Sequence, residues 1–250
     1  MKILLFSTLL QRAIAFANAP LTLWLFFKLL YPLSFGLSAL SVQAQVVPDG
    51  TLSSTVSSPD GQNFIIENGN HTGNNLFHSF SEFSIPTNGS AVFTNPTDIE
   101  TIFSRVTGPG LSNIDGLLQT TGTTNLFLLN PNGIIFGSNA QLDIAGSFTA
   151  STADSLTFTD GTKFSTIAAE PVLLSISVPV GLQFNAQGDI ESRGQLETGQ
   201  DLTLLGRNLY LEGELTADQN LTLQAQDTVT LRDTSTRPFI VRSGTDLTIQ

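Results

Sequence analysis

The sequence predicts an all-β protein whose chain winds into a solenoid of stacked β-coils, and three observations lead to this fold class. Short apolar runs of strand length recur between clusters of Gly, Asn, Asp and Pro. Charged residues make up only 12% of the chain and 21 residues are glycine, which suits many turns and few helices. The last third contains a repeat with a period of 19 residues, and short periods of this kind are typical of solenoids.

The apolar runs are the expected strands, and almost all are too short to form a helix of average length. They include residues 64–66, 76–77, 91–93, 117–118, 126–129, 134–136 and 156–158. Residues 99–106 also fit a helix, with Thr97 or Asp98 as N-cap and Gly108-Pro109 as the stop. A strand fits the same residues equally well.

The repeat predicts which leucines stack on one another. Residues 190–204 align with residues 209–223, so that Leu202 and Leu204 stand above Leu221 and Leu223. Leucines two residues apart point to the same side of a strand, and here that side is the core. A third copy starts near Thr228 and ends at residues 246–249, after an apparent insertion around residues 234–238. The last coil has no polar cap, so we expect the chain to be a fragment of a longer solenoid.

Residues 1–44 have the features of a signal peptide. The leader carries only positive charges, and the apolar residues 29–40 precede Val42-Gln43-Ala44, which places small residues where a signal peptidase reads them. We expect cleavage after Ala44, leaving Gln45 as the new N-terminus. The alternative is a membrane anchor at residues 13–30, but Lys28 interrupts that run. We therefore expect no stable transmembrane anchor.

Charge and composition exclude several functions. The net charge is −11, and all 21 acidic residues lie from Asp49 onward, which argues against binding to nucleic acid. The absence of cysteine excludes disulfides and leaves the chain free to be threaded unfolded. His71 and His78, the only histidines, are too few for a convincing metal site. No nucleophile elbow, phosphate loop or zinc-protease motif is present, so we expect no catalytic residue, metal or cofactor.

The tetrapeptide Asn130-Pro131-Asn132-Gly133 predicts a tight corner between two strands. Asn130 can bond to the following backbone, Pro131 presets its own φ, and Gly133 tolerates a positive φ. Strand-length apolar runs lie on both sides of it. Such a corner is recognised by a partner, or nucleates the first coils, or is a purely structural turn.

Residues 46–166 resemble the secretion domain of two-partner secretion exoproteins, the filamentous haemagglutinin N-terminal type. The sequences of the matching motifs are most similar to cyanobacterial members of that family. The motifs that carry the resemblance stand in the family's order. They are residues 77–83 (FHSFSEF), 103–107 (FSRVT), 112–116 (SNIDG), 126–134 (LFLLNPNGI) and 146–152 (GSFTAST). A second family motif is matched only in its first half, at Asn95-Pro96, and is not carried over.

The resemblance implies a right-handed parallel β-helix with an N-terminal cap and short extra-helical β-hairpins. It also implies a secretion motif, formed by Asn130, Pro131, Asn132, Gly133 and Ile134. The expected organisation is a signal peptide at residues 1–44, a secretion domain at 45–185 and the start of a β-helical passenger at 186–250. The implied partner is an outer-membrane β-barrel transporter, through which a non-enzymatic, adhesin-like exoprotein reaches the cell surface or the medium.

Two other functions remain open. The first is a β-helical enzyme that degrades polysaccharides, either a lyase or a glycoside hydrolase, whose carboxylates would come from the column Asp201, Asn220 and Asp246. The other interpretation of that column is a ladder of turn residues that bond nearby backbone. The second function is adhesion, in which the passenger binds a surface glycan or another cell-surface ligand.

Overall fold

The computed structural model describes residues 45–167, 174–184, 188–234 and 237–250. The expected signal peptide, including Ala44, lies outside these residues. Gln45 is exposed and directly precedes the first strand, β1 (Val46–Pro48). Within the described part of the chain, no helix is long and apolar enough to cross a membrane.

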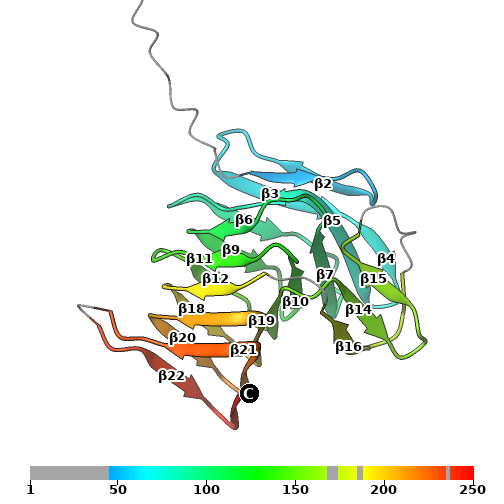
Figure 1. Ribbon diagram of the computed structural model, residues 1–250. Coiled ribbons are helices and arrows are strands. Elements are labelled where there is room, and N and C mark those ends of the chain that lie inside the picture. The colour runs from blue at the N-terminus through cyan, green and yellow to red at the C-terminus, as the bar shows by residue number, and fades with distance from the viewer. Residues whose placement is uncertain (1–44, 168–173, 185–187, 235–236) are drawn as a thin grey trace, which may run out of the picture. The chain divides into compact units, whose positions relative to one another are not determined.

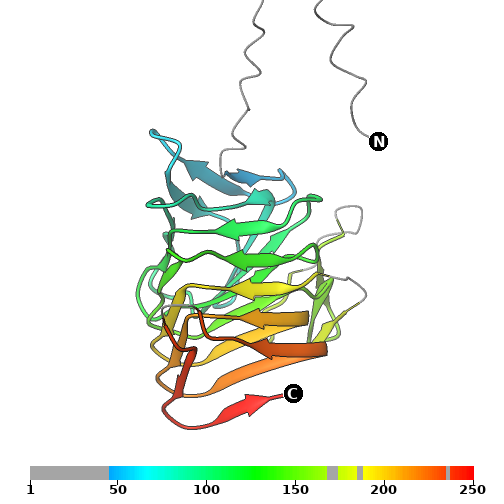
Figure 2. The same cartoon turned by 60° about the vertical axis from the view of Figure 1, so that its left-hand side comes forward.

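Three ladders of parallel strands form the faces of the molecule, and each coil contributes to them in turn (Figures 1 and 2). The first ladder consists of β5 (Asn75–Phe83), β7 (Thr101–Val106), β10 (Asn125–Leu129), β13 (Phe148–Ser151), β19 (Leu202–Leu211), β21 (Leu221–Leu231) and β23 (Leu247–Ile249). The second consists of β8 (Ser112–Ile114), β11 (Ile134–Phe136) and β17 (Ile190–Ser192), followed by the second halves of β19 and β21.

The third ladder closes each coil. It consists of β3 (Asn63–Asn68), β6 (Ser90–Phe93), β9 (Leu117–Thr120), β12 (Gln141–Asp143), β18 (Gln195–Thr198), β20 (Glu214–Ala217) and β22 (Ile240–Ser243). Every pairing between neighbours in it is parallel. This arrangement confirms the all-β, parallel β-helix fold class, and parallel crossovers of this kind are almost always right-handed.

Short antiparallel strands cover the N-terminal end of the stack, which confirms the expected cap. β1 pairs antiparallel with β5, β2 (Ser54–Ser57) with β3, and β4 (Asn70–Thr72) with β5. Reversed strands occupy hydrogen-bonding edges that would otherwise be open to pairing with another chain.

A three-stranded antiparallel sheet stands outside the coils, as the resemblance implied. Its strands are β14 (Ser155–Phe158), β15 (Lys163–Ser165) and β16 (Pro179–Gln183), inserted between β13 and β17 and seen on the right of Figure 1. This extra-helical sheet covers the outer side of the first ladder through a second apolar cluster. The cluster contains Phe77, Phe103, Leu129, Leu156, Phe158 and Phe164.

The main core is a column of aligned apolar side chains, and it confirms the predicted repeat. Leu202 pairs in register with Leu221, and Leu204 with Leu223; all four are fully buried. Residues 99–106, which fitted either a helix or a strand, contain β7 (Thr101–Val106). The strand is selected because β7 lies between β5 and β10 and completes the backbone hydrogen bonds of both.

Candidate functional site

The corner at Asn130 joins β10 of the first ladder to β11 of the second. The Gly133 amide donates to the Asn130 carbonyl at 3.1 Å and closes a four-residue turn. Gly133 has φ of 125°, a region that disfavours any residue with a Cβ atom. The turn chemistry expected from the sequence is therefore present, and it places the five motif residues at one edge between two faces.

Asn130 is fully buried and is bound to the preceding coil. Its side-chain Nδ2 donates to the Gly110 carbonyl and to Ser112 Oγ, both at 3.0 Å. Its Oδ1 accepts the Asn132 amide at 3.0 Å. Because both ends of this buried amide have partners, Asn130 holds two successive coils together.

Asn132 has a different environment, although it lies only two residues further along the chain. Its side chain is exposed, and Nδ2 donates to the Gly108 carbonyl at 2.8 Å. Pro131 beside it is partly exposed. The corner thus has a buried residue that fixes the coil and an outer pair, Pro131 and Asn132, that a partner can reach.

Ile134 completes the corner as a core residue. It is fully buried and stacks in register between Ser112 of the coil above and Ile190 of the coil below. Its amide donates to the Asp189 carbonyl at 3.1 Å. A Cβ atom on Gly188 would stand 2.5 Å from the Pro131 carbonyl oxygen, so this position requires glycine.

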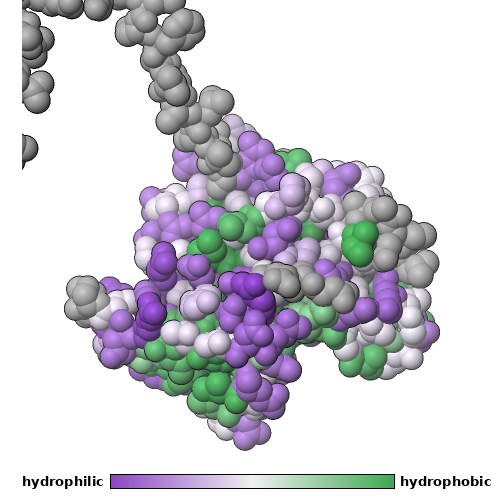
Figure 3. All heavy atoms as spheres, viewed as in Figure 1, coloured by the Kyte–Doolittle hydropathy of each residue, from purple (hydrophilic) through white to green (hydrophobic). Residues whose placement is uncertain are grey.

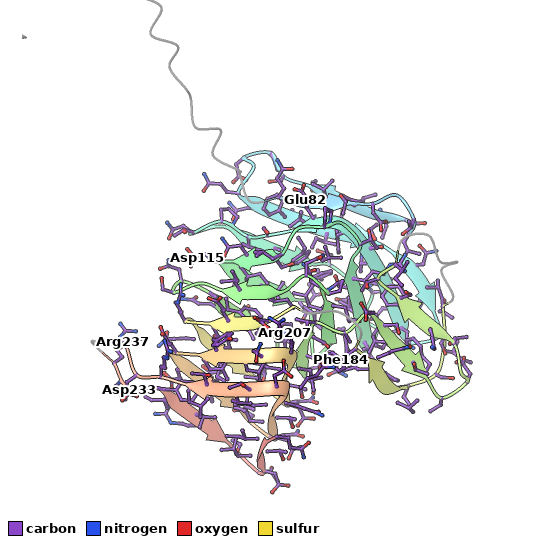
Figure 4. The ribbon with its side chains drawn as sticks, in the orientation of Figure 1. Glu82, Asp115, Phe184, Arg207, Asp233 and Arg237 are labelled. Carbon is purple, nitrogen blue, oxygen red and sulfur yellow. The ribbon has the colours of Figure 1, made fainter. Side chains whose placement is uncertain are left out.

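An ion pair fixes the coil below the corner. The Asp189 carboxylate accepts hydrogen bonds from Arg207 Nε at 2.9 Å and Nη2 at 3.0 Å, and from Asn208 Nδ2 at 3.0 Å. Partial burial opposes ionisation, but the hydrogen bonds from Arg207 and Asn208 outweigh it and lower the pKa of Asp189. Arg207 lies over the body of the stack (Figure 4).

The acidic column considered for an enzyme forms a turn ladder at its first step. Asp201 Oδ1 accepts the backbone amide of Asn220 at 3.0 Å and its side-chain Nδ2 at 2.9 Å. One level further on, the Asp246 carbonyl accepts the Leu221 amide. Across the described residues, no group of three His, Cys, Asp or Glu side chains could hold a metal ion.

Sequence reasoning assigned no role to the charged centre beneath the extra-helical sheet. Arg105 is fully buried; its Nε donates to Ser79 Oγ at 2.8 Å, and its Nη2 donates to Thr51 Oγ1 at 3.1 Å. Nη1 donates to the Ser165 carbonyl, and the guanidinium lies 4.9 Å from the Phe164 ring centre. The signal in the sequence is an arginine within a short strand whose other residues are all uncharged and include three apolar ones.

The two histidines differ. His78 is fully buried, stacks on Phe80 and contacts Ser54 Oγ through Nδ1 at 3.1 Å. His71 is exposed and lies 3.8 Å from an Asp98 carboxylate oxygen. Among the described residues, neither histidine belongs to a group of three or more His, Cys, Asp or Glu side chains that could hold a metal ion.

The structural class of this chain is a capped parallel β-helix with an extra-helical antiparallel sheet and an Asn-Pro-Asn-Gly corner. The chain belongs to the TPS (two-partner secretion) secretion domain family, whose model matches residues 44–244. Proteins of this family are exoproteins secreted across the outer membrane. The family resemblance predicted from the five motifs is therefore confirmed.

Three individual proteins that are similar to this chain share 27% sequence identity with it or less. The HMW1 secretion domain from Haemophilus influenzae has 23% sequence identity and a TM-score of 0.50, covering 72% of this chain and 43% of that chain. The filamentous hemagglutinin secretion domain has 13% identity and a TM-score of 0.40, covering 82% of this chain and 99% of that one. The Heme/hemopexin-binding protein of Haemophilus influenzae is 27% identical over 143 residues, or 55% of this chain. The chain spans only 14% of the length of that relative.

Proposed function

We propose that this chain directs the export of an exoprotein through an outer-membrane β-barrel transporter and presents a β-helical passenger at the cell surface or in the medium. The single observation that carries the proposal is the family match over residues 44–244. In the proposed organisation, residues 1–44 are removed after Ala44, residues 45–185 form the secretion domain, and residues 186–250 begin the passenger.

The stacked coils supply a physical source for outward movement. Each new coil covers the apolar side chains of the one before it, as Leu221 covers Leu202. Complete burial of one leucine contributes about 1.5–3 kcal/mol before the loss of chain entropy is counted. Because every coil docks on a finished one, folding outside the membrane proceeds in sequence and opposes backward sliding. Export of this kind requires no nucleotide.

The corner at Asn130 has two proposed roles. Asn130 and Ile134 act through folding, because both are buried and bound to neighbouring coils. Pro131 and Asn132 are the residues that the transporter would read, because they are accessible at the same edge. Exposed strand edges offer a further way to engage the transporter, by strand addition.

The experiment is export in cells that carry the partner transporter, comparing the unaltered chain with Asn132→Ala, Asn130→Ala and the double variant. Asn130→Ala should unfold at lower urea concentration, because Gly110 and Ser112 lose a buried partner, at a cost of about 1–3 kcal/mol. Asn132→Ala should keep nearly normal stability and lose export. N-terminal sequencing of the exported chain should give Gln45 as the first residue.

Controls separate export from folding. Asn139→Ala alters an exposed asparagine at the next corner, whose Nδ2 bonds to Asp115, and should leave export unchanged. Normal export of the double variant at normal stability would remove the corner from the mechanism. Export that persists after loss of the transporter would overturn the proposal as a whole.

For the passenger we propose adhesion rather than catalysis, with a surface glycan or another cell-surface ligand as the target. The carboxylate of Asp201 is engaged by Asn220 in a turn ladder, which supports this choice over a polysaccharide-degrading enzyme. Incubating the exported chain with acidic polysaccharide, with and without Ca²⁺, should release no new chain ends.

A further inference from the structure

The positive charges of this acidic chain gather on its last coils. From Gln45 onward there are seven Lys and Arg residues, and five of them lie between residues 193 and 242. They are Arg193, Arg207, Arg232, Arg237 and Arg242. Residues 189–246 also carry ten Asp and Glu residues, so each arginine must be examined for a carboxylate that already neutralises it.

A hollow of about 220 Å³ opens on the outer face of β17, β19 and β21, among these charges. Its side chains form two columns that the strand register aligns. Tyr210 pairs with Glu191 on one side and with Thr230 on the other. Two residues further along the chain, directly after the ends of β17, β19 and β21, stand Arg193, Glu212 and Arg232, so the columns are about 7 Å apart.

Tyr210 is the only Tyr or Trp after Gln45, since Trp24 and Tyr31 lie in the leader. Its exposed fraction is 40%, whereas most phenylalanines of the coils are fully buried. An accessible aromatic ring with a hydroxyl group at its edge offers both an apolar face and a hydrogen-bonding group. Tyrosine and arginine are also the residues that most often dominate binding surfaces.

The arginines around Tyr210 fall into two groups. Arg193 forms salt bridges with Glu191 at 3.3 Å and Glu212 at 3.8 Å. Arg232 is exposed, and within the described residues its guanidinium has no carboxylate within salt-bridge distance. Arg232 is therefore a cation that a ligand can neutralise.

A second hollow of about 180 Å³ lies next to the first and shares Arg193 with it. Its lining includes Gln195, Thr234 and Arg237, and Arg237 also has no salt bridge within the described part of the chain. Figure 4 shows Arg237 and Asp233 on the connection between β21 and β22. The Asp233 carboxylate accepts the Phe239 amide at 2.8 Å, so backbone already engages this negative charge.

We propose that these two adjoining hollows bind an acidic oligosaccharide that carries carboxylate groups. Arg232 and Arg237 pair with carboxylates of successive sugar units, and Arg193 occupies the ridge between them. A sugar ring lies against Tyr210, while Glu212 and Thr230 accept hydrogen bonds from its hydroxyl groups. The two open arginines favour an acidic ligand over a neutral one.

This site gives the glycan part of the proposed function a location and a ligand class, and it does not depend on the export role. The test is calorimetry on the full chain recovered after export, with a trimer of galacturonate as the probe. A neutral trisaccharide of equal length and a sulfated one form parallel arms. The galacturonate trimer should bind, the neutral sugar should not, and added salt should weaken binding.

Variants then locate the contact. Arg232→Gln and Arg237→Gln should each weaken binding about tenfold, as expected for one lost charge-assisted hydrogen bond. Tyr210→Ala should weaken it further, and Tyr210→Phe should retain most of it. Lys163→Gln is the control, because it also removes one positive charge and Lys163, on β15 of the extra-helical sheet, lines neither hollow. All of these variants should be exported normally, so a failure of binding is distinct from a failure of export.

Three results would overturn the proposal. They are no heat with the galacturonate trimer, equal affinity for the neutral sugar, and unchanged affinity after substitution of Arg232 or Arg237. A fourth result, preference for the sulfated trimer, would also overturn it, because the carboxylate would not be the recognised group. Circular dichroism of each variant should match that of the unaltered chain. If Tyr210→Ala does not fold, the affinity of Tyr210→Phe still tests whether the aromatic ring or the hydroxyl group contacts the sugar.

Discussion

At the residue scale, burial separates side chains of the same type. Asn130 and Asn132 have the same side chain and are two positions apart, but one is buried between coils and the other is exposed. Turn chemistry predicted the corner that holds them. The burial of Asn130 was not predictable, because its partners Gly110 and Ser112 come from the preceding coil.

His78 makes the stability of the cap depend on pH. Burial lowers the pKa of His78 to about 4, whereas in the unfolded chain it should be near 6.5. Between these values the unfolded chain binds a proton that the folded chain rejects. The free energy of unfolding should therefore fall as the pH drops from about 6.5 to 4, by about 3 kcal/mol in total.

Urea unfolding at pH 7 and at pH 4.5 checks this expectation. His78→Gln should remove most of the pH dependence, even if it lowers stability at both pH values. His71→Gln is the matched control, because His71 is exposed, and it should leave the dependence intact. The carboxylates with lowered pKa, such as Asp49 and Asp189, change the free energy of unfolding mainly at pH values below about 4. An unchanged slope in His78→Gln would refute the assignment.

At the scale of elements, Arg105 connects the cap, the coil stack and the extra-helical sheet. Its guanidinium bonds to Thr51 before β2, to Ser79 on β5 and to Ser165 on β15. Asp49 accepts the Ser79 hydroxyl at 2.5 Å and so places a negative charge behind this network. The three elements are thereby held by one buried charge.

Arg105→Met should detach the extra-helical sheet from the outer side of β7. Loss of several charge-assisted bonds that are buried should cost about 3 kcal/mol. Hydrogen exchange should show amides of β14 and β15 losing protection before those of the coils. Lys163→Met is the control, because its exposed Nζ bonds only to Gln183, and it should change stability by less than about 0.5 kcal/mol. Equal protection in both variants would contradict the role of Arg105.

At the scale of the whole molecule, the contribution of a leucine to the free energy of unfolding depends on whether a neighbouring coil covers it. Leu202, Leu221 and Leu247 occupy one column in successive coils. The first two are fully buried, whereas Leu247 is 45% exposed. Figure 3 shows apolar surface gathered over these last coils.

Leu221→Ala and Leu247→Ala test the stack with the same chemical change at two levels. Leu221→Ala should lower the free energy of unfolding by about 2–5 kcal/mol, because a cavity forms between two coils. Leu247→Ala should cost about 1 kcal/mol or less, because half of its side chain is already in water. Urea denaturation measures both. Equal losses would show that the column is not stacked in this order.

The sequence by itself determined the features that repeat along the chain. The period of 19 residues predicted the pairing of Leu202 with Leu221, and turn residues predicted the corner at Asn130, because both depend on neighbours at a fixed spacing. The five ordered motifs predicted the family. Only the tertiary structure decided the burial of Arg105 and the hollow at Tyr210. Arg105 meets a carbonyl 60 residues away, and the hollow is formed by side chains of three coils. Contacts between groups so far apart depend on how the coils align and where the insertion folds back, and no local pattern encodes either.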